Sequence, residues 1–250
     1  MSTAVGATSA ILQQRTEALE SALRKLAVEH SPATFASSLG AEDMVLTDAI
    51  LRTGAAIEIF TLDTGRLNPE TLSVLDLVRS HYGYEILIYR PNPVAVEQYV
   101  RDHGLNAIYE SVELRSRCCD IRKVEPLKRA LAGKRAWVTG MRRAQSVTRK
   151  SLPLEEFDPA DALWKFNPLA EWLEREVWDY IRAHEVPYNP LHDQGFRSIG
   201  CAPCTRPTAA GEDLRAGRWW WENPESKECG LHKRPTDTQP PTTTEQRKHA

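Results

Sequence analysis

The sequence of 250 residues contains no apolar run of about 18 residues, so no transmembrane helix is expected. Its first twenty residues, MSTAVGATSAILQQRTEALE, lack a basic segment followed by an apolar stretch and therefore do not predict a secretory signal. We expect a cytoplasmic protein. In that compartment the five cysteines are more typical of metal binding or redox chemistry than of structural disulfides.

A strong net charge is also missing, because 32 basic and 34 acidic residues give −2. The balance is uneven along the chain. Residues 111–150 contain twelve basic and three acidic side chains, a net charge of +9, so the other 210 residues carry −11. A basic zone in an otherwise acidic protein favours an anionic ligand or surface. A solvated helix face explains some of these charges, but not their position around the adjacent Cys118 and Cys119.

Short β-rich runs alternate with helical patterns in the first half of the chain. Strands are predicted at residues 33–39, 56–63, 84–90 and 135–140. Helices are predicted at 41–53, 68–82 (with Asn68 as N-cap and Pro69 after it), 93–104 and 119–133, and one more begins the stretch 174–196. This alternation predicts an α/β fold, with a mostly parallel twisted sheet and helices on both of its faces.

Three polar loops follow three of the predicted strands: SSLGAED (37–43), DTGR (63–66) and GMRRAQ (140–145). Ligands of parallel sheets bind beyond the carboxyl ends of the strands, so a site is expected there. SSLGAED offers backbone N–H groups and a helix N-terminus to an anion, but it matches neither the P-loop nor GxGxxG, and an ordinary turn explains it as well. Asp63 is suited either to a ribose or adenine group or to capping the next segment.

Four cysteines form two pairs, Cys118–Cys119 and Cys201–Cys204. The second pair has metal-hairpin spacing, and together they make a set of four thiolates. Adjacent cysteines reach one compact zinc centre only with strain, whereas a [4Fe–4S] cluster has widely spaced corners. A [4Fe–4S] cluster is therefore favoured, with zinc and a redox dithiol as alternatives.

Cys229 stands alone in the polar stretch NPESKECGLHKRP (223–235). A small buried side chain is the ordinary role of a lone cysteine, but this charged, turn-rich surrounding is a poor place for one. Nearby cations would favour a thiolate, so a nucleophile is the preferred interpretation. The preceding WWW (219–221) suits either stacking on a ring or packing of the C-terminal segment onto the body.

Taken together, CC (118–119), GCAPCTRP (200–207), GEDLRAGRWWWE (211–222) and ECGLH (228–232) resemble the assimilatory phosphosulfate reductases, specifically the iron–sulfur adenylyl-sulfate (APS) reductases. SSLGAED, LDTGR and TGMRRAQSVTR extend the resemblance over roughly residues 33–232. It implies an adenine-nucleotide α-hydrolase-like fold with a C-terminal cysteine-bearing segment, about 222–232. We expect one domain over 1–232 and a disordered Pro- and Thr-rich tail over 233–250.

The resemblance also implies roles for individual residues. Cys229 matches the catalytic nucleophile, and Cys118, Cys119, Cys201 and Cys204 match the ligands of one [4Fe–4S] cluster per chain. The residues that match substrate-binding groups are Ser37, Ser38, Gly40, Asp63, Thr64, Lys123, Gly140, Arg142, Arg143, Arg149, Arg215, Arg218 and His232. Lys123 matches the lysine that links cluster and substrate.

The implied reaction belongs to sulfate assimilation and cysteine biosynthesis: APS is reduced to sulfite and AMP through an S-sulfocysteine, with thioredoxin or glutaredoxin as reductant. The same residues leave a PAPS-reducing or dual-substrate enzyme open. A zinc-bound RNA-interacting module and a nucleotidyl-transferring enzyme are alternatives from other classes, and both would give Cys229 no role. Neither a nucleic acid nor a membrane partner is expected, and a homo-oligomer is compatible with the sequence.

Overall fold

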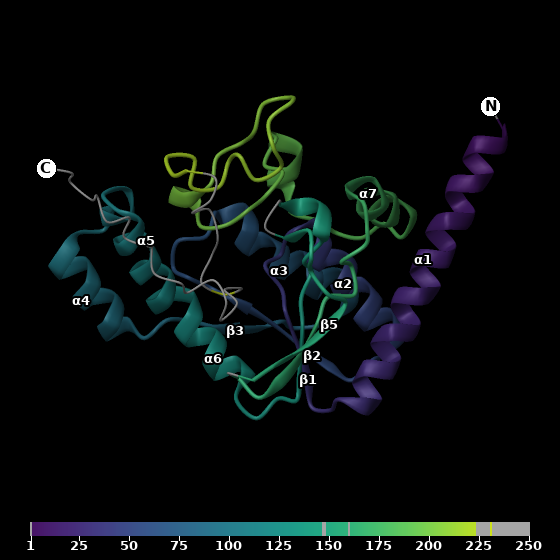
Figure 1. Ribbon diagram of the computed structural model, residues 1–250, viewed down its shortest axis with the longest axis horizontal. Coiled ribbons are helices and arrows are strands. Elements are labelled where there is room, and N and C mark those ends of the chain that lie inside the picture. Colours follow the sequence, from purple (N-terminus) through teal and green to yellow (C-terminus); the bar gives the residue numbers. More distant parts are fainter. Residues whose placement is uncertain (1, 147–148, 160, 224–230, 232–250) are drawn as a thin grey trace, which may run out of the picture.

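The computed structural model describes residues 2–146, 149–159, 161–223 and 231. Its centre is a six-stranded sheet of order β3-β2-β1-β4-β6-β5 (Figure 1). The strands are β1 (Ala33–Ala36), β2 (Ile57–Leu62), β3 (Leu87–Tyr89), β4 (Ala136–Val138), β5 (Glu155–Asp158) and β6 (Leu163–Phe166). All neighbouring pairs are parallel except β5–β6. The predicted mostly parallel α/β fold is therefore confirmed.

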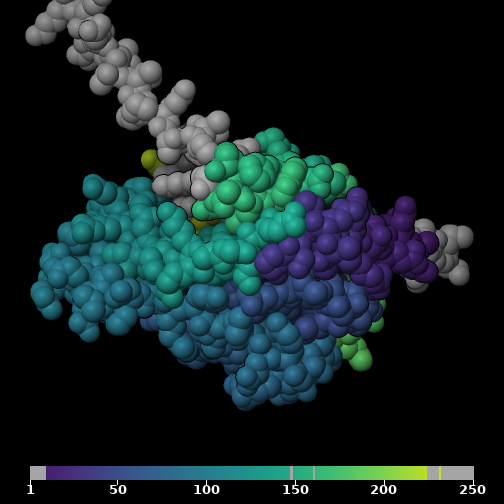
Figure 2. Space-filling model, turned by 90° about the horizontal axis from the view of Figure 1, so that it is seen from below, coloured from purple at the N-terminus to yellow at the C-terminus, as the bar shows by residue number. Residues whose placement is uncertain are grey.

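Helices cover both faces of this sheet. One face carries α1 (Ser2–Glu29), α2 (Ala41–Thr53), α3 (Pro69–Tyr82) and α7 (Glu174–Ala183), which share the main core with the buried side chains of β1. On the other face, α6 (Glu125–Leu131) packs with Phe60 and Trp137 in a smaller core. The α1 helix and the region of α4 (Pro93–His103) and α5 (Val112–Cys119) lie at opposite ends of the molecule (Figures 1 and 2).

Helix boundaries in the first half follow the sequence pattern closely. The predicted helix at 41–53 has those limits, and Gly83 and Gly104 are the C-caps that follow α3 and α4. Asn92 accepts hydrogen bonds from the N–H groups of Val94 and Ala95, which makes it the N-cap of α4. Asn68 occupies the N-cap position of α3, but its side chain makes no capping hydrogen bond.

The helix predicted over 119–133 is present as far as Leu131, but it starts earlier than predicted and is not regular throughout. Helix α5 begins earlier, at Val112, because Ser111 accepts a hydrogen bond from the N–H of Leu114. A π-helical turn, η2 (Asp120–Val124), then joins α5 to α6. Pro126 has no N–H to donate to the carbonyl of Arg122, so the regular hydrogen-bond ladder is interrupted here. This wider turn lies directly after the two cysteines, and π turns recur at functional sites.

Strands β5 and β6 have no counterpart among the predicted strands. Each has only four residues, and β5 reads Glu-Glu-Phe-Asp, a composition depleted in strands. They form because the existing sheet offers them partners: β6 pairs in parallel with β4, and β5 pairs antiparallel with β6.

No helix in the described part of the chain is long and apolar enough to cross a membrane. The predictions for Cys229, His232 and the tail at 233–250 lie outside the described residues.

Candidate functional site

A cavity of about 200 Å³ opens at the carboxyl ends of β1, β2 and β4. The first predicted loop contributes Ser37, Ser38 and Gly40 to its lining, the second contributes Thr64, and the third contributes Gly140. Apolar side chains, including Leu62, Leu127 and Trp137, cover another part of the wall. The sheet topology therefore brings together three loops that are far apart in the sequence, as expected for a parallel α/β protein.

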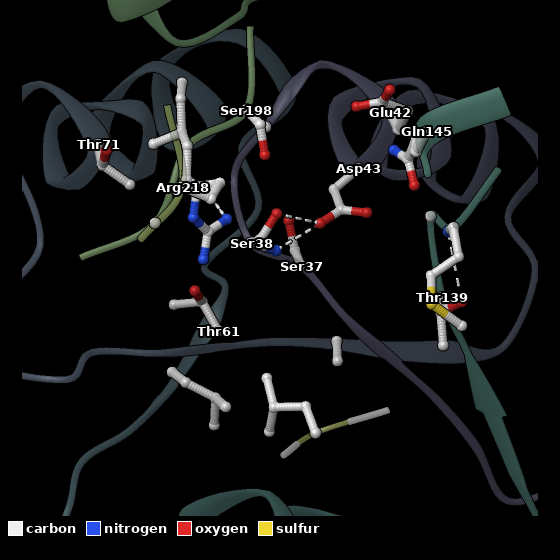
Figure 3. Close-up of a pocket in the computed structure, with 18 of the residues that line it drawn as sticks. Ser37, Ser38, Glu42, Asp43, Thr61, Thr71, Thr139, Gln145, Ser198 and Arg218 are labelled. Carbon is white, nitrogen blue, oxygen red and sulfur yellow. Dashed lines mark hydrogen bonds between the residues drawn. The ribbon is translucent and has the colours of Figure 1, made fainter. Parts of the chain in front are cut away.

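Asp43, in the first loop, lies in close contact with Gly140 of the third loop. Its carboxylate oxygen Oδ2 accepts hydrogen bonds from both the N–H and the hydroxyl of Ser38, each at 2.6 Å (Figure 3). A Cβ atom on Gly140 would lie 2.0 Å from Asp43 Oδ1, so this close approach requires glycine. Burial raises the pKa of Asp43 to about 6, although the Ser38 hydrogen bonds oppose that rise.

Five lysine and arginine side chains line the cavity: Lys123, Arg149, Arg197, Arg215 and Arg218. Arg218 lies against Gly200, where an added Cβ would come within 2.5 Å of Arg218 Nη2, and it donates to the carbonyl of Ile199 at 3.0 Å. Its Nε is buried without a hydrogen-bond partner among the described residues. Figure 3 shows this guanidinium facing the space beside Ser38. A buried, incompletely bonded guanidinium in a cavity is suited to a phosphate or sulfate oxygen.

The three tryptophans divide into a buried one and two outer ones. Trp219 is 1% exposed, and the guanidinium carbons of Arg115, Arg215 and Arg218 lie 4.8, 5.9 and 4.6 Å from its ring centroid. Trp220 and Trp221 instead pack on each other and near Tyr109. Trp219 therefore holds two cavity arginines in place by cation–π contact.

The two cysteine pairs meet in one buried cluster, although they are more than 80 positions apart in the sequence. No disulfide joins these four described cysteines, and they line a second, smaller cavity of about 10 Å³ together with Arg66, Arg115, Arg122 and Lys123. The hydroxyl of Thr64 lies 3.2 Å from Cys201 Sγ. Lys123 lines both cavities, so it stands between the cysteine cluster and the larger cavity.

Burial raises the pKa of the Cys118 thiol, and it raises that of Cys204 to about 11. Lys123 and Arg218 oppose the rise at Cys204. Among the described residues, no group of three or more His, Cys, Asp or Glu side chains has the arrangement of a site for a metal ion. The four cysteines are therefore described as one group because they are buried together and have basic side chains beside them.

Most of the predicted substrate-binding residues that the structure describes line the larger cavity. These are Ser37, Ser38, Gly40, Thr64, Lys123, Gly140, Arg149, Arg215 and Arg218.

Three predicted residues have other surroundings. Asp63 accepts hydrogen bonds from the N–H of Gly65 and from Arg90, so it acts as a local cap. Arg142 is 1% exposed and ion-paired with Glu42 at 2.7 Å, behind the cavity wall. Arg143 donates to the carbonyl of Leu152 and pairs with Glu171.

Several cavity residues are missing from the sequence prediction, notably Glu42, Asp43, His192 and Arg197. Glu42 and Asp43 belong to the SSLGAED motif, but negatively charged carboxylates are not expected to bind an anion. His192 and Arg197 come from an irregular loop without a recognisable motif. Leu231 also lines the cavity, and it lies two positions after Cys229 in the sequence.

The fold and the cavity define an α/β protein that binds a ligand at the carboxyl edge of a parallel sheet. Solved structures share this architecture. One is the phosphoadenylyl-sulfate (PAPS) reductase of Candida auris in complex with phosphate, with a TM-score of 0.64, 29% identity, and coverage of 74% of this chain and 88% of that one. Yeast FAD synthetase in complex with FAD matches at a TM-score of 0.57 and 15% identity, over 80% of this chain and 68% of that one, which shows the fold alone. These neighbours confirm the adenine-nucleotide α-hydrolase-like fold.

The chain belongs to the phosphoadenosine phosphosulfate reductase family, whose domain model matches residues 32–207. Similar proteins include the adenosine 5′-phosphosulfate reductase of Allochromatium vinosum, 63% identical over 80% of this chain and 78% of that protein. The protein of the same name from Burkholderia cepacia is 58% identical over 88% of each chain. The resemblance identified in the sequence is thus confirmed at the level of the family.

Proposed function

We propose that this protein reduces adenosine 5′-phosphosulfate to sulfite and AMP in sulfate assimilation. The observation that carries the proposal is the cavity at the carboxyl edge of the sheet, where Lys123, Arg149, Arg215 and Arg218 converge beside buried cysteines. Relatives at 46–63% identity bear the name of that reductase, which favours it over an RNA-binding or nucleotidyl-transferring role.

The charge of the cavity fits the chemistry of the substrate. APS carries a phosphate joined to a sulfate, and attack by a thiolate brings a further negative charge to the same place. Cationic side chains already fixed around this region reduce the repulsion and stabilise the phosphate of the departing AMP. The apolar wall of Leu62, Leu127 and Trp137 is suited to the flat face of an adenine base.

Cys229 is the proposed nucleophile. Its thiolate attacks the sulfur of APS, a Cys229–sulfur bond forms, and the bond between sulfur and the bridging phosphate oxygen breaks. AMP leaves with the bonding electron pair, and S-sulfocysteine remains on the enzyme. Leu231, two positions after Cys229 in the sequence, lines the cavity, which supports this assignment.

A dithiol protein, thioredoxin or glutaredoxin, completes the reaction. One of its thiolates attacks Cys229 Sγ, and sulfite leaves with the electron pair of the broken S–S bond. The second redoxin thiol then resolves the mixed disulfide, so the redoxin supplies both electrons and Cys229 returns to its reduced state. Such reduced redoxins are available in the cytoplasm, where we place the protein.

We further propose that Cys118, Cys119, Cys201 and Cys204 hold one [4Fe–4S] cluster. The residues fit this group: four sulfur donors that no disulfide joins are buried together, and basic side chains around them offset thiolate charge. Binding of iron would displace the thiol protons that burial retains. The cluster would supply a fixed charge distribution next to Lys123, and the chain's own residues perform the transfer described above.

The test is intact-mass analysis of anaerobically purified protein mixed with APS in the absence of a thiol reductant. The expected result is a single sulfonate adduct that maps to Cys229 and is released as sulfite by thioredoxin. A Cys229→Ser variant, which retains the cluster cysteines, should form no adduct. If the wild type forms none although iron and labile sulfide are present, the assignment of APS is wrong. Repeating the reaction with PAPS then separates a different substrate from a different reaction.

A further inference from the structure

The first turn of α2 forms part of the cavity wall, and its N-cap has no side chain. Gly40 occupies this position and cannot cap the helix with a side-chain oxygen. The N–H of Ala41 instead donates to Nε2 of His192, at 3.2 Å, from a residue 151 positions away. His192 itself lines the cavity. A histidine from the far side of the sequence therefore supplies the acceptor that the helix end lacks.

This hydrogen bond determines the protonation of His192. Because a backbone N–H can only donate, Nε2 must be unprotonated, and the ring proton is on Nδ1. His192 is thus a neutral imidazole that accepts through Nε2.

The segment that carries His192 is rigidly attached. It is a 3₁₀ turn, η5 (Pro190–Gln194), and the Asn189 side chain before it accepts from the N–H of Leu191. Asn189 also donates to the hydroxyl of Thr71 at 3.0 Å, which ties the turn to α3. The ring of Trp178 on α7 packs edge-on against the imidazole, with centroids 5.2 Å apart.

The charged groups around the imidazole have other partners. Glu42 of α2, Asp193 of the same turn and Glu174 of α7 each favour the protonated ring. Their nearest partners are Arg142, the Tyr188 hydroxyl and Arg197, respectively. Burial outweighs the three carboxylates and lowers the pKa of His192 below its usual value. The neutral form is therefore maintained at neutral pH.

The loop before Ala41 needs to be held. Leu39 has a φ of 62° and is fully buried, a left-handed conformation that is unfavourable for leucine. Such a residue persists only where its surroundings fix it. Two hydrogen bonds hold the chain on either side of the N-cap residue Gly40. Before it, the N–H of Ser38 donates to Asp43, and after it, the N–H of Ala41 donates to His192. Loss of the second bond would leave a wall of the cavity free to relax.

We propose that His192 is a positioning residue for nucleotide binding, which holds the first loop and the N-terminus of α2 through its hydrogen bond with Ala41. The inference rests on the proposed function only in the identity of the ligand. Its structural core is the bond itself, which can be tested in the absence of any ligand.

The first experiment is amide hydrogen exchange of the full-length holoprotein, followed by mass spectrometry of peptides that cover residues 37–44. His192→Leu removes the acceptor and should accelerate exchange there. His192→Gln places an amide oxygen near the position of Nε2 and should restore protection. His184→Gln is the matched control, because His184 contacts Arg52 and does not line the cavity. Equal protection in wild type and His192→Leu would overturn the proposal.

The second experiment measures AMP binding calorimetrically with the same four proteins. At pH 7.5 the leucine variant should bind about 5- to 100-fold more weakly, as expected for a lost hydrogen bond with an unsatisfied donor. The glutamine variant should stay within about threefold of wild type, because it keeps the acceptor. Equal weakening in both variants would contradict the hydrogen-bond role. If wild type fails to bind AMP while exchange behaves as expected, the proposed ligand is wrong and the positioning role stands.

The pH profile separates this role from simple packing. Between pH 7.5 and 5.5, protonation of His192 turns its acceptor into a donor, so wild-type affinity should fall more steeply than that of His192→Gln. The titrations of AMP and of Asp43 are common to both proteins and cancel in the comparison. Parallel profiles would overturn the proposal, and if the leucine variant does not fold, this comparison decides the question.

Discussion

Lys123 is the single residue most directly placed to couple the two cavities, since it lines both. We predict that Lys123→Ala lowers kcat/KM for APS by about 10²-fold, because a fixed charge near the developing anion is lost. Iron and labile sulfide should remain at wild-type levels, because the cysteines are unchanged. Steady-state kinetics and iron analysis of the same preparation make the test.

Lys128→Ala is a suitable control for this prediction. Lys128 lies five residues later, on the exposed side of α6, and lines neither cavity. Lys128→Ala removes the same charge from the molecule, but from a position outside both cavities. The kcat/KM of this variant should therefore stay near that of wild type. Equal losses in both variants would mean that general charge, and not the place of Lys123, assists the reaction. Normal turnover of Lys123→Ala would refute its role altogether.

Gly140 illustrates how a close backbone approach constrains one residue. A Cβ atom there would lie 2.0 Å from Asp43 Oδ1 and 3.3 Å from Glu42 Cβ. We expect Gly140→Ala to lower stability by about 1–3 kcal/mol, as other forced insertions into packed sites do. Gly40→Ala is the control, because its Cβ would meet only Ser38 Oγ at 3.5 Å, an ordinary contact. Thermal unfolding of the two variants decides it, and a smaller loss at Gly140 would contradict the model of a tight contact.

At the scale of elements, a buried ion pair fastens the C-terminal segment to α5. Arg115 donates through Nε and Nη2 to the two oxygens of Glu222, at 2.8 and 2.7 Å, and both side chains are at most 3% exposed. Removing one partner leaves the other charge buried. Glu222→Ala should therefore destabilise the protein by about 3–5 kcal/mol and also weaken AMP binding, because Arg115 supports Trp219.

The exposed pair of Glu125 and Arg129 on α6 provides the comparison. Both side chains are about half exposed, so Glu125→Ala should change stability by less than about 1 kcal/mol. Thermal unfolding and calorimetric AMP titration of both variants test the pair. Similar losses of stability in the two variants would show that burial does not increase the contribution of the Arg115–Glu222 ion pair to stability.

The whole molecule responds to pH through two groups at one helix end that act in opposite directions. The pKa of Asp43 rises from 3.8 to about 6 on folding, so the folded state binds the extra proton. Its contribution to stability therefore increases as pH falls from about 7 to 4, by an amount on the order of 2–3 kcal/mol. Asp43→Asn keeps an acceptor for Ser38 and should remove this component from melting curves recorded across that range.

His192 has the opposite sign, because its pKa is lowered on folding from 6.5. Its contribution is complete above pH 6.5 and is lost as pH falls below that value toward the folded pKa. In His192→Gln, melting temperatures should decline less on acidification than in wild type. If both variants follow the wild-type curve, neither group titrates as the structure indicates.

The fold class and the family could be predicted from the sequence because they depend on local patterns and short motifs. The alternation of β-rich and helical runs predicted the limits of α2 and four of the six strands, and the two cysteine pairs were visible in the sequence. The +9 window shows the limit of such reasoning. Arg115, Arg122 and Arg142 contribute to it, yet each is buried against an internal partner: Glu222, the carbonyl of Thr64 and Glu42. Counting charge could not separate these from the cations that line the cavity.

What only the tertiary structure decided is which distant residues share one surface. The N–H of Ala41 meets an imidazole 151 positions away, Lys123 faces two cavities, and β5 and β6 form a sheet edge that their composition does not predict. The physical reason is that local propensity acts over a few residues, whereas burial and hydrogen-bond satisfaction act on whatever the folded chain brings together. The sequence by itself determined the chemistry available to this protein, and the fold determined where each part of it acts.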